Sequence, residues 1–190
     1  MQVLTTGEKI KRARIYNGLT LKDVASNIVS ISKLSGIEND KITPEYEIIK
    51  YLSATLNLSE NYIKEGVEKQ LLDNYRELIK NKINKNYVDD IKYNIHYSKK
   101  YKYYNIAFKF MHVLVKYYIN SDKTSSVEDD LAEYYDLLTK VDTEENKIIY
   151  YLDLGTYLYK FEEYNSAIKC FLNVKDRVNY KKNPNIYFKI

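Results

Sequence analysis

The chain has 190 residues, with 30 Lys and Arg against 26 Asp and Glu, one cysteine, and 45% hydrophobic residues. This length allows one large domain or two small ones. A single cysteine excludes an internal disulfide, no stretch approaches the roughly 20 apolar residues that span a bilayer, and the first residues lack the apolar core of a signal peptide. We therefore expect a soluble, cytoplasmic protein.

Turn-forming residues are scarce, with five Gly and two Pro in the whole chain. Sheets need more turn residues than helices joined by short loops do, so the composition predicts an all-α fold. The charge is uneven, since residues 67–126 contain 12 Lys and Arg but only 6 Asp and Glu. The first 22 residues contain one acidic residue, Glu8, and five basic ones, Lys9, Lys11, Arg12, Arg14 and Lys22. This basic cluster suits phosphate contact, although a solvated helix face is the more ordinary explanation.

Three short helices are expected before residue 40. The first runs from Thr6 to Asn17, and Gly18 ends it in the left-handed conformation. Thr20 caps the second helix, over residues 21–28, and the third begins at a cap supplied by Ser30 or Ser32. Helical spacing predicts that these two helices bury Leu21, Val24, Ala25, Ile28, Leu34 and Ile37.

Two further short helices complete the first part of the chain. Thr43-Pro44-Glu45 predicts a helix start in which Thr43 is the cap and Pro44 takes the first helical position. The buried stripe of that helix is Ile48, Leu52 and Leu56, and Ser59 caps a fifth helix containing Tyr62 and Ile63.

Longer helical periods follow from about Glu68. They predict helices near residues 68–83, 87–99, 102–119, 126–140, 144–160 and 163–178, with caps from Ser126 to Asp129 and at Thr143. Paired helices of this length indicate a helical-hairpin repeat.

The segment RARIYNGLTLKDVASNI, followed by SISKLSGIEND and the Thr43-Pro44 helix start, resembles the Cro/C1-type (XRE) helix-turn-helix family. The matching positions are Arg14, Gly18, Leu19, Thr20, Ala25, Ile37, Glu38 and Asn39. The resemblance implies a DNA-binding domain over residues 1–66. It also implies a buried structural ion pair between Arg14 and Glu38, so that Arg14 is not a DNA contact.

Residues 148–181 are similar to the tetratricopeptide repeat (TPR) at Tyr151, Leu154, Gly155, Leu158, Ala167 and Phe171. The resemblance implies that Gly155 and Ala167 lie where two helices cross. Asn179 stands where the repeat usually closes with proline, and residues 87–120 fit the pattern poorly apart from Ala107. We expect residues 67–190 to form a TPR-like domain that is incomplete at its C-terminus, because a further repeat helix should begin after Pro184.

A repressor-type domain joined to such repeats resembles the RRNPP peptide-responsive regulators of Gram-positive bacteria. That resemblance implies a transcription regulator that binds a palindromic DNA operator as a homodimer. It also implies control by a short signalling peptide bound to the repeats, as in quorum sensing.

The third helix would then contact DNA through its start. The positions expected to be exposed there are Ser30, Ile31, Ser32, Lys33, Ser35 and Gly36, and Lys22 and Lys41 are expected phosphate contacts. Serines can bond base edges or phosphates, and Ile31 can meet a thymine methyl group. The alternative is that the serines only cap and solvate the helix.

The resemblance places the peptide groove on the first helix of each hairpin. The residues expected to line it are Asn146, Ile149, Leu152, Thr156, Tyr159 and Lys160. Asn94, Asn105 and Asn146 could bond a peptide backbone, since one amide both donates and accepts. Asparagine is common in this chain, so the absence of any role is the more ordinary explanation.

Catalysis has little support in the sequence. His96 and His112 lack the spacing of a metal pair, Cys170 has no second cysteine beside it, and no glycine loop suits a phosphate. We expect no enzyme activity, no cofactor and no metal. The competing hypothesis is a helical-repeat scaffold for protein interactions whose helix-turn-helix domain is degenerate.

Overall fold

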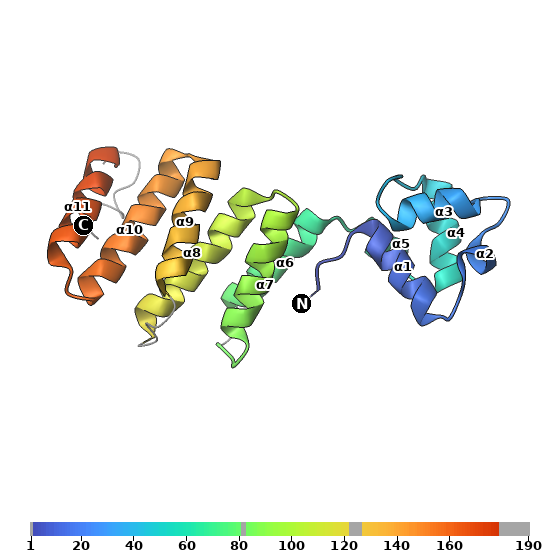
Figure 1. Ribbon diagram of the computed structural model, residues 1–190, viewed down its shortest axis with the longest axis horizontal. Coiled ribbons are helices and arrows are strands. Elements are labelled where there is room, and N and C mark those ends of the chain that lie inside the picture. The colour runs from blue at the N-terminus through green and yellow to red at the C-terminus, as the bar shows by residue number, and fades with distance from the viewer. Residues whose placement is uncertain (1, 81–82, 122–126, 179–190) are drawn as a thin grey trace. The chain divides into compact units, whose positions relative to one another are not determined.

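The computed structural model describes residues 2–80, 83–121 and 127–178. These residues contain eleven α-helices and no β-strand, which confirms the predicted all-α class (Figure 1). None of the helices within these ranges is both long enough and apolar enough to cross a membrane. The chain divides into two compact units, residues 1–73 and 74–190, each described below by itself.

The five short helices predicted for the first unit are confirmed. They are α1 (Thr6–Tyr16), α2 (Leu21–Val24), α3 (Ile31–Glu38), α4 (Tyr46–Leu56) and α5 (Glu60–Lys64), and the unit also includes the start of α6 (Val67–Lys80). Gly18 has the expected positive φ of 69° after α1, and Ser30 is the cap of α3. The buried core that these helices enclose comprises Ile10, Val24, Val29, Leu34, Ile37, Ile48, Leu52, Leu56 and Ile63.

The predicted second helix is too long. Helix α2 ends at Val24, and Ala25 already has extended backbone with ψ of 147°. The Ser26 hydroxyl accepts a hydrogen bond from the Ile28 amide, and such local side-chain bonds compete with helix continuation. The burial prediction was wrong at Ile28, which is 52% exposed, and Val29 is buried in its place.

The predicted start of the fourth helix is also wrong. Helix α4 begins at Tyr46, and its cap position is Glu45, which makes no side-chain cap bond. Thr43 and Pro44 therefore lie in the preceding loop, where Pro44 is buried. The predicted buried stripe of Ile48, Leu52 and Leu56 is nevertheless confirmed.

The second unit continues α6 and adds α7 (Tyr87–Lys100), α8 (Tyr104–Asn120), α9 (Val127–Val141), α10 (Glu144–Lys160) and α11 (Tyr164–Arg177). The predicted ranges agree with these bounds to within a few residues, and Thr143 caps α10 as expected. The predictions about Ser126, Asn179 and Pro184 lie outside the described residues.

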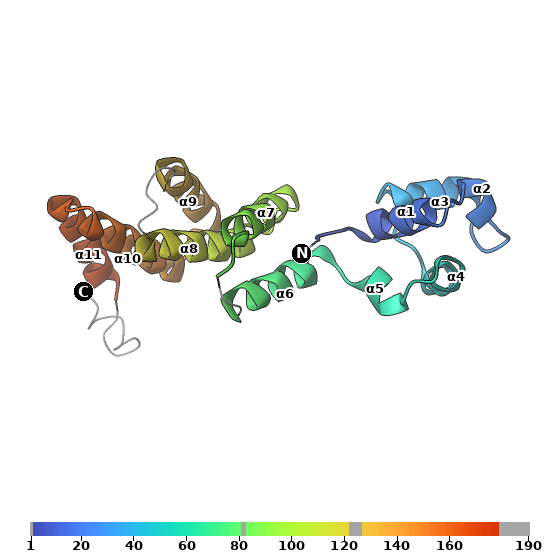
Figure 2. The same cartoon turned by 90° about the horizontal axis from the view of Figure 1, so that it is seen from below.

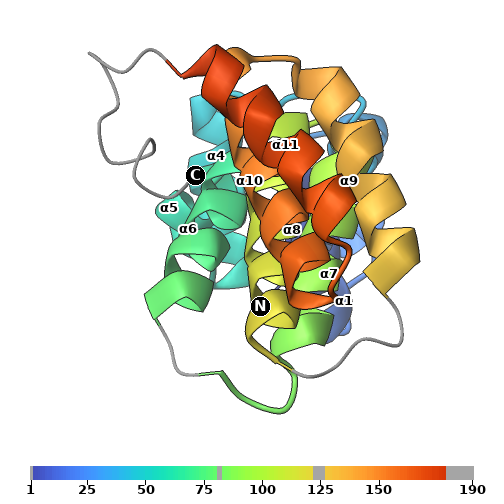
Figure 3. The same ribbon diagram turned by 90° about the vertical axis from the view of Figure 1, so that its left-hand side faces the viewer.

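Helices α8 and α10 lie parallel and in register, with a separation of 41 residues. His112 is bonded to Asp153, and Lys160 Nζ donates to the Ile119 carbonyl, both across 41 positions. Helices α7 and α9 pack on one side of α8 (Figure 2), and Figure 3 shows the same arrangement from the end of the unit. Equivalent helices thus repeat along the unit, as in a helical-hairpin array.

The crossing of α10 and α11 has the small residues that the TPR resemblance implied. A Cβ at Gly155 would lie 2.7 Å from Cε1 of Phe171, and Ala167 is 1% exposed. A larger residue at Gly155 would therefore require the Phe171 ring or the helices to shift. The packing at this crossing agrees with the sequence prediction.

Candidate DNA interface and helical groove

Helix α3 is held against α1 by a two-pronged ion pair. Arg14 Nε donates to Glu38 Oε1 at 2.6 Å, and Arg14 Nη2 donates to Glu38 Oε2 at 2.8 Å. The two side chains are 12% and 3% exposed, and Arg14 Nη1 also donates to the Leu19 carbonyl. The hydrogen bond to Glu38 raises the pKa of Arg14. The arginine is thus occupied within the domain, as expected from its family resemblance.

A second junction fixes the end of α3, and the sequence analysis missed it. Asp40 follows α3 with a positive φ of 54°, and its carboxylate accepts hydrogen bonds from the Thr5 hydroxyl and the Gly7 amide. A Cβ at Gly7 would lie 2.3 Å from the Ile37 carbonyl oxygen, so only glycine allows this approach. The sequence signal for this junction was Gly7 itself, because glycine is an unusual choice in the first turn of a helix.

The start of α3 presents polar and apolar side chains to solvent. Ser30, Ile31 and Ser32 are exposed, and Ile31 has 48% of its surface accessible. Ile28, in the loop before α3, is exposed as well because α2 ends early. This end of α3 therefore offers hydroxyl groups beside two isoleucines.

Three residues predicted to be exposed on α3 are only half-exposed: Lys33, Ser35 and Gly36. The amine of Lys33 is paired with Glu45 at 2.9 Å. A Cβ at Gly36 would lie 2.5 Å from Cδ1 of Ile42, so this glycine admits the Ile42 side chain. Gly36, which was predicted to be exposed, is therefore only half-exposed because Ile42 packs against it.

The basic residues among the first 22 differ in their exposure to solvent. Lys9 is 1% exposed, and its amine donates to the carbonyls of Tyr62 at 2.7 Å and Glu65 at 2.6 Å. Burial lowers the pKa of Lys9. Counting Lys9 as a solvent-facing charge was therefore wrong, whereas Lys22 and Lys41 are exposed as expected.

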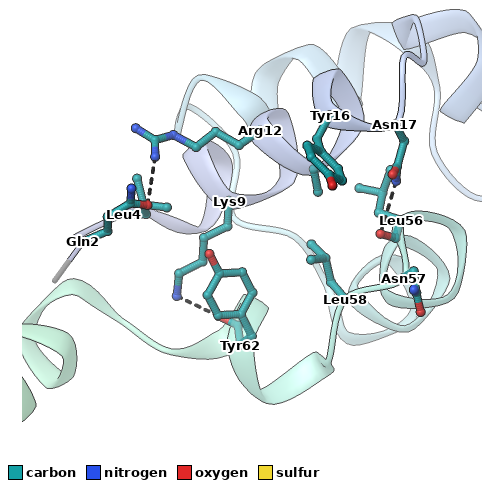
Figure 4. A pocket seen from close by; sticks show the side chains of 11 residues that line it. Gln2, Leu4, Lys9, Arg12, Tyr16, Asn17, Leu56, Asn57, Leu58 and Tyr62 are labelled. Atoms are coloured by element: carbon teal, nitrogen blue, oxygen red, sulfur yellow. Dashed lines mark hydrogen bonds between the residues drawn. The ribbon is translucent and has the colours of Figure 1, made fainter.

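A pocket of about 460 Å³ lies in the first unit between α1, α5 and the loop at Asn57 (Figure 4). The buried Lys9 and the ring of Tyr62 form one part of its wall, and Lys9 Nζ lies 4.6 Å from the ring centroid. Arg12 at its edge donates to the Gln2 amide oxygen. Its charged groups are thus already bonded to protein atoms.

The second unit contains two adjoining pockets along α8, of about 510 and 320 Å³, that share Tyr75 and His112. We call them together the groove. Residues from α6, α8 and the start of α10 line it. Ile83, just before α7, and Tyr87, at the start of α7, complete the lining of the smaller pocket.

The expected peptide-binding residues fall into two groups. Asn146 and Ile149 line the larger pocket, together with Asn105. Four others line neither pocket: Leu152, Thr156, Tyr159 and Lys160. Asn94 is fully buried and bonded to Asn74 and to the Asp90 carbonyl, which agrees with the more ordinary explanation that it has no role as a ligand contact.

The buried carboxylate of Asp153 is hydrogen-bonded to His112, which lines the groove. Oδ2 of Asp153 accepts hydrogen bonds from Nδ1 of His112 and, at 2.9 Å, from the Tyr134 hydroxyl. Asp153 is 5% exposed and Tyr134 is fully buried. Burial, followed by the charge of Asp153, raises the pKa of Tyr134 far above its ordinary value. This network fixes the imidazole that lines both pockets.

Within the described ranges no three His, Cys, Asp or Glu side chains are placed to hold a metal ion. Burial raises the pKa of the Cys170 thiol, which disfavours the reactive thiolate.

Residues 7–69 match the model of a family described as "Helix-turn-helix domain". No curated protein matches the chain. Among solved structures, the chain is similar to Bacillus thuringiensis PlcR in complex with the peptide PapR7 and DNA, at 16% identity and a TM-score of 0.33, over 97% of this chain and 85% of that one. It is also similar to the Streptococcus dysgalactiae SHP pheromone receptor Rgg2, at 12% identity and a TM-score of 0.31, over 94% and 81%. Residues 7–69 of the present chain thus form a helix-turn-helix domain.

Proposed function

We propose that this protein is a sequence-specific, DNA-binding transcription regulator whose operator binding is controlled by a short peptide in the groove of its second unit. The observation that supports this most strongly is the exposed start of α3 within a domain that matches the helix-turn-helix family. Such a helix enters the major groove with its first residues toward the base edges.

In this proposal the contacts divide by chemistry. Ser30 and Ser32 bond base edges or phosphates, Ile31 packs on a thymine methyl group, and Lys22 and Lys41 neutralise phosphates. Lys33 and Ser35 contribute from partly buried positions, whereas Gly36 is covered by Ile42 and makes no proposed contact. Two copies with their α3 helices about 34 Å apart would match a palindromic operator.

The groove is the proposed peptide site. Its lining residues follow α8 from Asn105 to Asn120, which is about 22 Å at the helical rise per residue. An extended chain covers that length with about seven residues. Asn105 of α8 and Asn146 of α10 both line the larger pocket and offer amides that can bond a peptide backbone. Leu152, Thr156, Tyr159 and Lys160 would contact the peptide only where it extends beyond the pockets.

A selection from random DNA duplexes tests the first half of the proposal. The full-length protein should enrich a palindromic sequence, and its affinity should fall steeply as salt rises, since phosphate contacts release counterions. The variant Ser32→Ala/Ile31→Ala should lose the sequence preference, whereas Lys50→Gln, an exposed change on α4, should keep it. A protein that enriches no sequence and shows no salt dependence would instead fit the scaffold hypothesis.

A further inference from the structure

Three basic side chains form a line along the groove. Lys109, His112 and Lys116 stand at positions i, i+3 and i+7 of α8, which places them on one face of the helix. Lys109 lines the larger pocket, Lys116 the smaller, and His112 both. The two lysines are exposed, and neither has a hydrogen bond or ion pair with another described residue.

The acidic groups near this line do not neutralise it. Asp153 is buried and lines neither pocket, and its carboxylate accepts hydrogen bonds from His112 and Tyr134. Glu145, near the start of α10, is the one carboxylate among the described residues that line the pockets. The segment of residues 67–126, which supplies α6 and α8, contains twice as many basic as acidic residues. The groove thus faces its occupant with an excess of positive charge.

We propose that the groove selects an acidic peptide, whose Asp or Glu side chains pair with Lys109 and Lys116. This inference rests on the proposed peptide control and names the chemistry of the ligand. Seven helical positions separate the two lysines by about 10 Å, which is the length of about three residues in an extended chain. The peptide therefore carries acidic residues two to four positions apart.

The experiment is affinity selection from a random heptapeptide library, with C-terminally amidated peptides and the full-length protein. Amidation removes the terminal carboxylate, so any enriched negative charge belongs to side chains. The selected peptide is then titrated against Lys109→Gln/Lys116→Gln and against the control Lys102→Gln, an exposed lysine outside the groove. Glutamine keeps most of the length of lysine but removes its charge.

We expect enrichment of Asp and Glu at the stated spacing. The double variant should bind the selected peptide about tenfold more weakly and with less dependence on salt, while the control binds as the wild type does. Enrichment of neutral or basic peptides, unchanged affinity in the double variant, or binding only by peptides with a free C-terminus overturns the acidic-peptide inference and leaves peptide control in place. A selection that enriches no peptide, either from the amidated library or from the same library with free C-termini, overturns both.

Discussion

The ion pair between Arg14 and Glu38 gives the most quantitative stability prediction. In Glu38→Ala the guanidinium loses two hydrogen bonds and its counter-charge at a site where it is 12% exposed. Removing one partner of a buried pair typically costs about 3–5 kcal/mol. Arg14 keeps its bond to the Leu19 carbonyl, so we expect the low end, about 3 kcal/mol.

Two further variants separate charge from shape. Glu38→Gln keeps the shape and one acceptor but not the charge, and should cost about 2 kcal/mol. Arg14→Met/Glu38→Leu removes both charges and should cost less than Glu38→Ala, because no charge is left alone. A double variant more damaging than the single one would contradict this ranking.

The assay is urea unfolding followed by circular dichroism, with hydrogen exchange of the α1 and α3 amides to assign the transition to the first unit. The free energy of unfolding of that unit should fall in the stated order. A Glu38→Ala protein within about 0.5 kcal/mol of the wild type would refute the argument that this pair secures α3.

Four other substitutions have defined outcomes. Gly155→Ala places a Cβ 2.7 Å from the Phe171 ring and should destabilise the second unit by about 1–3 kcal/mol in thermal unfolding, unless Phe171→Leu is added. Gly18→Ala meets no neighbouring atom but keeps a φ of 69°, so it should cost about 1 kcal/mol in the same assay applied to the first unit. Replacing the contacted thymine by uracil should weaken wild-type DNA binding about fourfold in a fluorescence titration, but should not affect Ile31→Ala, which has lost the partner of the methyl group. Lys22→Gln should weaken binding to all duplexes alike and reduce the salt slope by about one, and a change confined to one sequence would contradict a phosphate contact.

Local signals predicted most of the first unit. Gly18, the Thr20 cap and the spacing of Leu34 and Ile37 depend on neighbours in sequence, and the structure agrees at each of them. Helix α2 was predicted too long because helical spacing continues through Ile28, while the Ser26 side chain bonds to the backbone and ends the helix.

Residues whose roles depend on distant partners were harder to predict. Lys9 looked like a surface charge, yet two carbonyls more than 50 positions away accept from its amine. Gly36 was predicted to be an exposed position of α3, but the side chain of Ile42 packs against it. Asn94 looked like a possible ligand contact, whereas it is a buried link to Asn74.

The groove was predicted only in outline. Its walls meet because α8 and α10 align at a separation of 41 residues, which is longer than the roughly 34 residues of a tetratricopeptide repeat. A search at the shorter period does not align His112 with Asp153. The spacing of Lys109, His112 and Lys116 is local, but the groove that they line depends on contacts between helices far apart in the sequence.

The most direct test of the account is DNA binding by the full-length protein with and without a groove peptide. The operator selected from random duplexes is titrated in the presence and absence of the heptapeptide selected from the library. We predict sequence-specific binding whose affinity changes at least severalfold when peptide is added, and loss of that response in Lys109→Gln/Lys116→Gln with peptide-free binding intact. Specific binding that no selected peptide alters would contradict peptide control, and the absence of specific binding would contradict the assignment as a transcription regulator.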